Sequence, residues 1–285
     1  MSGQEKIYEM VTDEIIKKLE QGVVPWKQPW TGGTSRVPYN YKTKKAYRGI
    51  NVLLLGLSGH NSRYWMSFKQ AQEFGGKVKK GEKGHLCVFW KIITKEEENE
   101  NGERIEKTIP LLRYYKVFNL DQVEGIEDPD IHNCNMDEAI EEAEQIIENY
   151  QDKPEIVSNE QSAYYNPNKD YINIPKFETF TDNSSYYSTL FHEMVHSTGH
   201  ESRLGRHINA SNFFGSEDYS FEELVAELGS SFLCAQTNIL NDTIDQSASY
   251  INAWLKKLRE NKKWIVQASG KAQKAVDYIT NQYQE

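Results

Sequence analysis

Cysteine is scarce in this chain, and long hydrophobic segments are absent. The 285 residues contain three cysteines, Cys87, Cys134 and Cys234, which are odd in number and far apart. Their spacing matches neither a zinc ribbon nor a disulfide framework, so a reducing compartment is expected. No run of 18 apolar residues occurs, and the first ten residues, MSGQEKIYEM, lack the apolar core of a signal peptide. We therefore expect a cytoplasmic protein without a membrane-spanning helix.

Acidic residues are nearly absent from one part of the chain, although the net charge is −9. Residues 27–91 contain 13 lysines and arginines but only two acidic residues, whereas residues 126–285 contain 12 basic and 27 acidic ones. A basic segment joined to an acidic one predicts an anionic partner for the N-terminal part. A solvated basic surface is the simpler alternative.

Apolar periodicity and turn residues predict an α+β protein of two domains, residues 1–125 and 126–285, with the boundary in the acidic stretch 121–136. The N-terminal predictions are helices at 5–21 and 65–74, a short helix or strand at 49–58, and strands at 85–93 and 110–120 that flank a charged excursion at 95–107. This excursion is expected to be a hairpin tip or a locally disordered loop. The C-terminal predictions are helices at 137–150, 219–235, 248–268 and 271–282, and a β-hairpin at 162–174.

Residues 192–196 read H-E-M-V-H, which is the motif H-E-x-x-H. Two histidines four residues apart share one face of a helix, so both imidazoles can bind one ion, and imidazole suits Zn²⁺. Glu193 can then accept a proton from a water activated by the ion, and later donate it to the leaving group. Residues 181–184 supply N-cap candidates, and Gly199 is a plausible end of the helix. The motif predicts a zinc hydrolase site, in which Mn²⁺, Co²⁺ or Ni²⁺ can substitute.

A catalytic zinc needs a third protein ligand beside His192 and His196. The metzincin pattern places a histidine where this chain has Ser202. His200 continues the row of the two histidines, but it lies beyond Gly199, where the helix is expected to end. A ligand from elsewhere in the chain is therefore favoured, with His200 kept as an alternative.

The segment 219–235 predicts a second helix, with Ser220 as N-cap and Glu223 completing a capping box. Glu223 and Glu227 are four residues apart and share a face of this helix. We predict that Glu223 binds the metal and that Glu227 accepts a hydrogen bond from a ligand histidine; the reverse assignment stays open. Tyr164 and Tyr219 are candidates, by position only, for stabilising the oxyanion of a tetrahedral intermediate.

Aromatic residues alternate with the cations of the basic segment. Binders of single-stranded DNA need this pairing, because cations contact phosphates while aromatic rings stack on unpaired bases. Trp90, inside a predicted strand, is expected to be buried instead. The candidates for contact with single-stranded DNA are Trp26, Lys27, Trp30, Tyr41, Lys44, Lys45, Tyr47, Arg48, Lys77, Lys79, Lys80 and Lys83.

Longer segments resemble a known family. VPWKQPW, KAYRGINVLLL, FKQAQEFGGKVKKGEKG and RYYKVFNLDQVEG resemble the N-terminal domain of ArdC-type antirestriction proteins. FHEMVHSTGHESRLGR and FGSEDYSFEELVAELGSSFLCA resemble their C-terminal zincin-like metallopeptidase domain. The resemblance covers nearly the whole chain and favours Glu223 over His200 as third ligand. It implies a protein of a plasmid or other mobile element that binds single-stranded DNA and protects incoming DNA from host restriction.

Two functions fit these motifs. In the first, the N-terminal domain binds single-stranded DNA and brings the zinc peptidase close to a protein substrate that is associated with DNA or with host restriction. In the second, the protein shields single-stranded DNA without catalysis, and its zinc is structural. A nuclease is disfavoured, since phosphoryl chemistry commonly uses two metals and oxygen-rich ligands.

Overall fold

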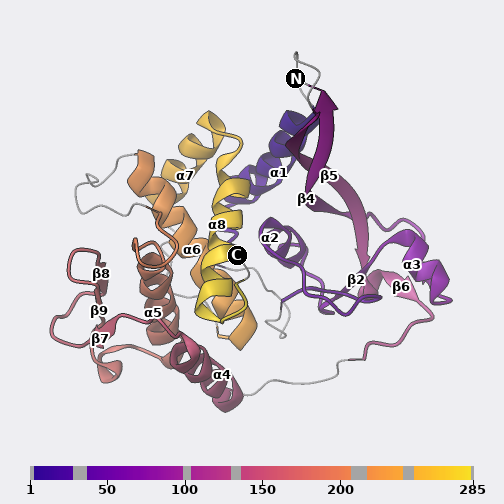
Figure 1. The fold of residues 1–285 in the computed structure, drawn as a ribbon. Helices are drawn as coiled ribbons and strands as arrows, with labels where there is room; N and C mark the ends of the chain where they lie inside the picture. Colours follow the sequence, from indigo (N-terminus) through magenta and orange to yellow (C-terminus); the bar gives the residue numbers. More distant parts are fainter. Residues whose placement is uncertain are drawn as a thin grey trace.

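The N-terminal strands and the C-terminal helices lie on opposite sides of the molecule, with α1 (Gly3–Glu20) and α2 (Ile50–Gly56) between them (Figure 1). The computed structural model describes residues 3–27, 37–98, 104–129, 136–206, 217–239 and 247–283, with the backbone alone at 91–98 and 104–110. The predicted α+β class is confirmed. Within the described ranges, no helix combines the length and the apolar character needed to cross a membrane.

The N-terminal region contains a four-stranded sheet in the order β1-β2-β5-β4 and a two-stranded sheet of β3 and β6. β1 and β2 are parallel, and the other neighbours are antiparallel. The elements after α2 are β2 (Tyr64–Met66), α3 (Phe68–Glu73), β3 (Lys77–Val78), β4 (His85–Glu98), β5 (Arg104–Asn119), a 3₁₀ turn (Leu120–Gln122) and β6 (Val123–Glu124), and β1 (Tyr39–Asn40) precedes α2.

The helix predicted for 65–74 is only partly present. Its first residues belong to β2, because Trp65 pairs with Asn119 of β5 and Met66 with Phe118. Ser67 then starts α3 as N-cap, and its hydroxyl accepts a hydrogen bond from the Gln70 backbone N–H in a capping box. The segment 49–58, left open between helix and strand, forms the helix α2.

β4 and β5 form one long antiparallel ribbon, called here the β4–β5 ribbon. Pairing begins at His85 opposite Val117 and continues to Glu98 opposite Arg104. The strands predicted at 85–93 and 110–120 therefore extend through most of the charged excursion, and 99–103 lies outside the described residues. Backbone pairing needs no apolar side chains, so a charge-rich sequence can continue a strand pair that a hydrophobic segment has begun.

The C-terminal region is mainly helical, with a three-stranded sheet in the order β7-β9-β8. The predicted hairpin at 162–174 is confirmed as β8 and β9, whereas the parallel neighbour β7 was missed. The predicted helices 248–268 and 271–282 are instead divided at residues 261–263. The elements are α4 (Met136–Asn149), β7 (Glu155–Val157), β8 (Tyr164–Asn166), β9 (Tyr171–Asn173), a 3₁₀ turn (Phe177–Thr179), α5 (Asn183–Ser197), α6 (Glu217–Thr237), α7 (Ala248–Glu260) and α8 (Trp264–Ile279).

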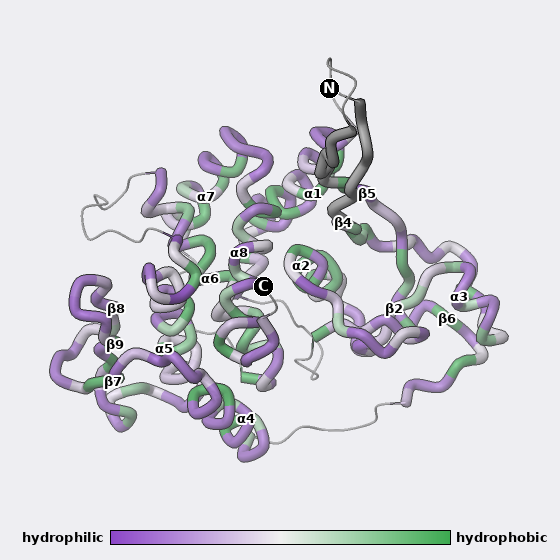
Figure 2. The backbone as a smooth tube through the Cα atoms, in the orientation of Figure 1, coloured by the Kyte–Doolittle hydropathy of each residue, from purple (hydrophilic) through white to green (hydrophobic). Residues whose placement is uncertain are grey.

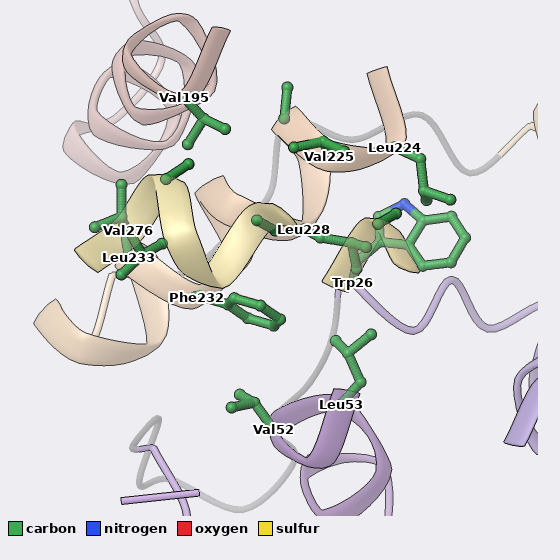
Figure 3. Close-up of a cluster of buried hydrophobic side chains, with 14 of the residues drawn as sticks. Trp26, Val52, Leu53, Val195, Leu224, Val225, Leu228, Phe232, Leu233 and Val276 are labelled. Carbon is green, nitrogen blue, oxygen red and sulfur yellow. The ribbon is translucent and has the colours of Figure 1, made fainter. Parts of the chain in front are cut away.

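One hydrophobic core joins the two regions. Hydrophobic residues concentrate where α2, α6 and α8 meet (Figure 2). Figure 3 shows Trp26 of the N-terminal region beside Leu224 and Leu228 of α6, with Leu53 of α2 nearby. Trp26 is fully buried and its ring contacts Trp254 of α7 edge-on, with centroids 5.6 Å apart. Because the core crosses between the regions, their relative position is set by packing and not by a linker.

Polar contacts reinforce this junction. Arg48 forms an ion pair with Asp277 of α8, and the Gly49 backbone N–H donates to Gln273 Oε1 at 2.8 Å. At the other end of the junction, the Thr12 hydroxyl donates to the carbonyl oxygen of Lys262 at 2.6 Å.

Candidate metal centre and nucleic-acid surface

The H-E-x-x-H motif lies in the second half of α5. Asp182 is the N-cap, and its carboxylate accepts a hydrogen bond from the Ser185 backbone N–H at 2.8 Å. The helix ends at Ser197, and the Gly199 N–H closes the last turn on the carbonyl of His196. The apolar residues of the motif, Met194 and Val195, are fully buried. One side of the helix is thus fixed in the core, and the predicted start and end of the helix are confirmed.

α5 and α6 approach each other closely beside the motif. Gly229 of α6 faces Val195, and a Cβ added to this glycine would lie 2.7 Å from Val195 Cγ2. The next residue of α6, Ser230, donates its hydroxyl to the carbonyl of Ser188 in α5 at 2.8 Å. A glycine at this contact lets the second helix come near enough for its carboxylates to reach the histidines.

Three side chains converge from the two helices. His192 Nε2 and His196 Nε2 are 3.0 Å apart, and each lies 3.5 Å from one carboxylate oxygen of Glu223. Among the described residues, this is the one group of three or more His, Cys, Asp or Glu residues whose ligand atoms lie within 4.8 Å of one another. Such separations fit one ion about 2.0–2.2 Å from each donor atom, and the donor set of two imidazoles and one carboxylate suits zinc.

α6 begins two residues earlier than the predicted segment 219–235. It starts at Glu217, so Ser220 lies inside the helix and the predicted capping box is wrong. Glu223 is consequently in the second turn, where its carboxylate faces the histidines instead of capping the helix.

A second carboxylate, Glu222, lies against the other side of His196. Its Oε1 is 3.5 Å from His196 Nδ1. Arg206 holds this carboxylate through two nitrogens, Nη2 to Oε1 at 2.7 Å and Nε to Oε2 at 3.1 Å. The same guanidinium donates to the Val195 carbonyl at 2.8 Å and to the Thr198 hydroxyl at 2.7 Å. Arg206 therefore ties Glu222 to the end of α5 and fixes the carboxylate that orients the histidine ring. The sequence analysis missed both residues, since only the fold brings position 206 beside 222.

Glu227, one turn after Glu223, is paired with Tyr250 of α7. The Tyr250 hydroxyl donates to Glu227 Oε2 at 2.5 Å, and the Trp26 indole N–H donates to that hydroxyl at 3.1 Å. Burial raises the pKa of Glu227 to about 7. Glu227 also interacts electrostatically with His192. Its role as hydrogen-bond partner of that histidine stays a prediction.

The remaining candidates, Glu193, Tyr219, Tyr164 and His200, differ in whether they contact the three-residue group. Glu193 is buried, with 8% of its surface exposed. Tyr219 shares a hydrogen bond with Glu223 and interacts electrostatically with Glu193, whereas the hydroxyl of Tyr164 is bonded to Tyr171 at 2.9 Å. His200 lies beyond the end of α5, with Nδ1 2.8 Å from the Ser202 hydroxyl, and it is not part of the three-residue group.

The carboxylates and the imidazoles of the three-residue group stabilise each other's charged forms. Burial lowers the pKa of His196, but the hydrogen bonds to Glu222 and Glu223 outweigh it and raise this pKa to about 10. For Glu223, burial raises the pKa, and the hydrogen bonds to His192 and His196 outweigh this and lower it. A cation bound here replaces a proton on imidazole, so metal binding is expected to release protons.

The residues predicted to contact DNA differ in how far they are exposed. Trp26 and Tyr47 are buried, at 0% and 8% exposure, so the prediction that their faces stack on bases is wrong: both have become core residues. Tyr41 is half-buried, with its ring against Phe74 and Lys44 Nζ 4.0 Å from its centroid. Trp30 lies outside the described residues. The other candidates are Lys27, which is half-buried, and Lys44, Lys45, Arg48, Lys77, Lys79, Lys80 and Lys83, which are exposed.

Exposed aromatic residues gather on the β4–β5 ribbon. Phe89 and Trp90 are 46% and 50% exposed, and Tyr114 and Tyr115 are 49% and 39% exposed. The expectation that Trp90 is buried is wrong, because the ribbon extends beyond the elements that cover its base. Only the period-two alternation of a strand could have indicated these residues, and alternation does not say where the cover of a strand ends.

Comparison with known proteins decides the family. Residues 5–118 match the model of the N-terminal domain of anti-restriction factor ArdC, and residues 141–271 match a zincin-like metallopeptidase model. The crystal structure of the antirestriction protein ArdC from plasmid R388, in its metal-free form, has 40% identity and a TM-score of 0.75 and covers 98% of this chain and 99% of that one. The chain belongs to the ArdC family of antirestriction proteins. The predicted two-domain organisation is thereby confirmed, while the boundary between residues 125 and 126 stays a prediction.

Other relatives extend the ArdC comparison. A Mn(II)-bound structure of the R388 protein has 39% identity and a TM-score of 0.74 over 96% of this chain and 97% of that one. Protein y4eC of Sinorhizobium fredii (strain NBRC 101917 / NGR234) is 36% identical over 96% of this chain and 91% of its own length. Two Escherichia coli proteins named DNA primase TraC are 35% and 32% identical, and the match spans 27% and 20% of their lengths. The ArdC-like chain thus corresponds to one part of those longer proteins.

Proposed function

We propose that this antirestriction protein is a metal-dependent peptidase that binds single-stranded DNA through its N-terminal domain. The observation that carries the peptidase proposal is the convergence of His192, His196 and Glu223 within 4.8 Å, with Glu193 buried in the same helix as the histidines. Two imidazoles and one carboxylate leave a coordination position open for water, which is typical of catalytic and not of structural zinc.

The chain's own residues divide the work of hydrolysis. His192, His196 and Glu223 would hold a divalent cation, and Zn²⁺ is the ion that this donor set favours. Such an ion supplies Lewis acidity toward water and the substrate carbonyl. Glu193 removes the proton from the attacking water and returns it to the leaving amine. Tyr219, which shares a hydrogen bond with Glu223, is the candidate to donate a hydrogen bond to an oxyanion.

The test is proteolysis by the zinc-loaded protein, with an unstructured protein as substrate. Glu193→Gln keeps the size of the side chain but removes the base, and it should lower the rate about 10²–10⁴-fold while the bound zinc is unchanged. Glu201→Gln is the matched control, because Glu201 is an exposed residue just beyond the motif. Cleavage that survives in Glu193→Gln would remove this residue from the mechanism.

The main alternative is a protein that shields single-stranded DNA without catalysis and whose metal is structural. A closed site would need a fourth protein ligand. The described residues offer three, and the nearby His200 is directed to Ser202. Absence of cleavage under every condition, with zinc bound and DNA bound, would favour this alternative over the peptidase.

For DNA, one face of the β4–β5 ribbon has the required chemistry. Phe89 is paired with Arg113 and Cys87 with Tyr115, so Phe89, Arg113 and Tyr115 lie on the same face. All three are exposed. Two rings that can stack on bases thus lie beside a guanidinium that can contact a phosphate. We assign this face, called here the Phe89 face, to single-stranded DNA.

The Phe89 face continues toward a cationic turn. The Tyr115 hydroxyl shares a hydrogen bond with Tyr47, which directly precedes the exposed Arg48. Lys45 lies on the same turn and is also exposed. Because Arg48 is ion-paired with Asp277, Lys45 is the cation of this turn that a strand stacked on the ribbon can reach. The buried Tyr47 supports this surface from below and does not contact the bases itself.

Binding of a fluorescent oligothymidine tests this assignment. Phe89→Ala should weaken binding about 5- to 150-fold, the equivalent of one lost stack of 1–3 kcal/mol. Trp90→Ala removes an exposed ring from the opposite face and should change binding little, and Phe177→Ala, an exposed ring in the C-terminal region, is the second control. Affinity should fall steeply with salt and be lower for duplex DNA. Equal losses in Phe89→Ala and Trp90→Ala would contradict the choice of face.

A further inference from the structure

His60 and His85 meet in the N-terminal domain although they are 25 positions apart. His60 follows α2 in the chain, and His85 is the first residue of β4. Their Nε2 atoms are 3.2 Å apart, and the rings are nearly perpendicular at 84° with centroids 5.1 Å apart. Both rings contact Trp65 edge-on, at 5.8 and 5.2 Å, which limits how far either can turn.

The arrangement reproduces that of the two histidines of the H-E-x-x-H motif. His192 and His196 also direct Nε2 atoms at each other, at 3.0 Å, with rings inclined at 76° and centroids 4.7 Å apart. Two imidazole nitrogens about 3 Å apart can both bind one ion at the usual bond length of about 2.0–2.1 Å. The second pair thus has the spacing of a metal site without the helical motif.

A carboxylate lies behind one of the two rings. His60 Nδ1 is 3.8 Å from Asp121 Oδ2, and the Asn61 backbone N–H donates to that oxygen at 2.7 Å. A carboxylate on the nitrogen that faces away from the ion is the usual partner of a metal-bound histidine. Glu82 interacts electrostatically with both histidines, and its Oε2 accepts a hydrogen bond from Gln122 at 2.7 Å.

The two histidines are in the neutral form that binds a metal ion. Burial lowers the pKa of His85 to about 4, and the neighbouring His60, Lys116 and Lys18 oppose a proton there as well. Burial also lowers the pKa of His60. Both rings are therefore neutral at pH 7, so an ion need not displace a proton from either of them. The side chain of His60 is 22% exposed, which leaves an approach for the ion and for water ligands.

We propose that His60 and His85 form a second metal site, which binds a single transition-metal ion through two Nε2 atoms and water. Two imidazoles favour Cu²⁺, Ni²⁺ or Zn²⁺ over the hard cations Mg²⁺ and Ca²⁺. The site lies in the DNA-binding domain, and it does not depend on the proposed peptidase activity.

The competing explanation is a plain hydrogen bond, in which one neutral ring donates its Nε2–H to the other. Metal binding distinguishes the two explanations, because a hydrogen-bonded pair takes up no ion. The histidines of the H-E-x-x-H motif can also bind an ion. The experiment must therefore count the bound ions and assign each of them to one of the two histidine pairs.

Titration calorimetry of Ni²⁺ into the metal-stripped, tag-free protein gives the count. The wild-type chain should bind two ions. His85→Gln and His60→Gln should each bind one ion, and the control variant His200→Gln should bind two. A His192→Gln/His196→Gln double variant should retain one ion, which His85→Gln then removes. One ion in the wild-type chain, or two in His85→Gln, would overturn the proposal. The use of two single variants, with circular dichroism on each, separates loss of the site from loss of the fold.

Electron paramagnetic resonance with Cu²⁺ gives an independent assignment. In the His192→Gln/His196→Gln double variant, one bound Cu²⁺ should show coupling to two nitrogens, and His60→Gln should reduce this to one nitrogen or abolish binding. A spectrum without nitrogen coupling would place the ion on carboxylates and contradict the assignment to the histidine pair.

Discussion

The metal centre and the β4–β5 ribbon use charged side chains in opposite ways. At the metal centre, Arg206 and Glu222 are only 6% and 15% exposed, and each is held by several hydrogen bonds. On the ribbon, Arg113 is exposed on the same face as Phe89 and Tyr115. A metal site needs fixed geometry, which a buried network provides, whereas a DNA surface needs accessible rings and cations. Substitutions should therefore act on one function and spare the other.

The largest effect on metal affinity is expected from the carboxylate beside His196. Glu222→Gln removes the charge that orients the ring and leaves Arg206 buried beside a neutral amide. We expect zinc affinity to fall about 10–100-fold, the usual loss when such a partner is removed, while oligothymidine binding is unchanged. Competition with a chromophoric chelator measures this. Glu217→Gln, at the exposed start of α6, is the matched control. Equal zinc affinity in Glu222→Gln and wild type would show that the network does not support the metal.

A smaller effect is expected where α5 and α6 touch. Gly229→Ala places a Cβ 2.7 Å from Val195, so we expect a loss of about 1–3 kcal/mol from overpacking, reduced by the roughly 1 kcal/mol that alanine gains over glycine in a helix. Gly270→Ala is the control, because no atom lies within 4 Å of its Cβ, and this variant should be stabilised. Urea unfolding of both variants gives the comparison. Stabilisation of both would mean that the two helices are farther apart than described.

More of the candidate metal centre than of the proposed DNA surface could be predicted from the sequence. The motif spacing places His192 and His196 on one helix face, and the face shared by Glu223 and Glu227 follows from their separation of four, so these elements could be predicted. Arg206 could not, because its contact with Glu222 depends on how the chain returns after α5.

The proposed DNA surface depends on which side chains are exposed, and composition does not give the exposure of a residue. Trp26 and Trp90 have the same side chain, yet Trp26 is buried between α6 and α7 and Trp90 is half exposed on the ribbon. The prediction was reversed for both. Likewise, His60 and His85 come together only through the pairing of β2, β4 and β5, and no spacing in the sequence indicates it.

The smallest effect is expected from Glu227, which links the metal centre to the N-terminal domain through Tyr250 and Trp26. The pKa of Glu227 is about 7 in the folded protein and about 4.5 when unfolded, so the folded state binds more protons between these values. Its contribution to stability is present below pH 4.5 and is lost as the pH rises through 7. Glu227→Gln keeps an acceptor for Tyr250 without a buried charge.

Thermal unfolding in the presence of a chelator measures this effect. The melting temperature of Glu227→Gln relative to wild type should increase between pH 5 and pH 8. A constant difference across this range would mean that Glu227 does not titrate in the folded protein.

We infer that the two regions act together, with DNA binding bringing the proposed peptidase to its substrate. The most direct measurement compares cleavage of one single-stranded-DNA-binding protein, free and on DNA, by the zinc-loaded chain and by its Phe89→Ala and Glu193→Gln variants. We expect faster cleavage on DNA, loss of this acceleration in Phe89→Ala with the rate on the free substrate unchanged, and no cleavage by Glu193→Gln. Equal rates with and without DNA would contradict the link between the two regions.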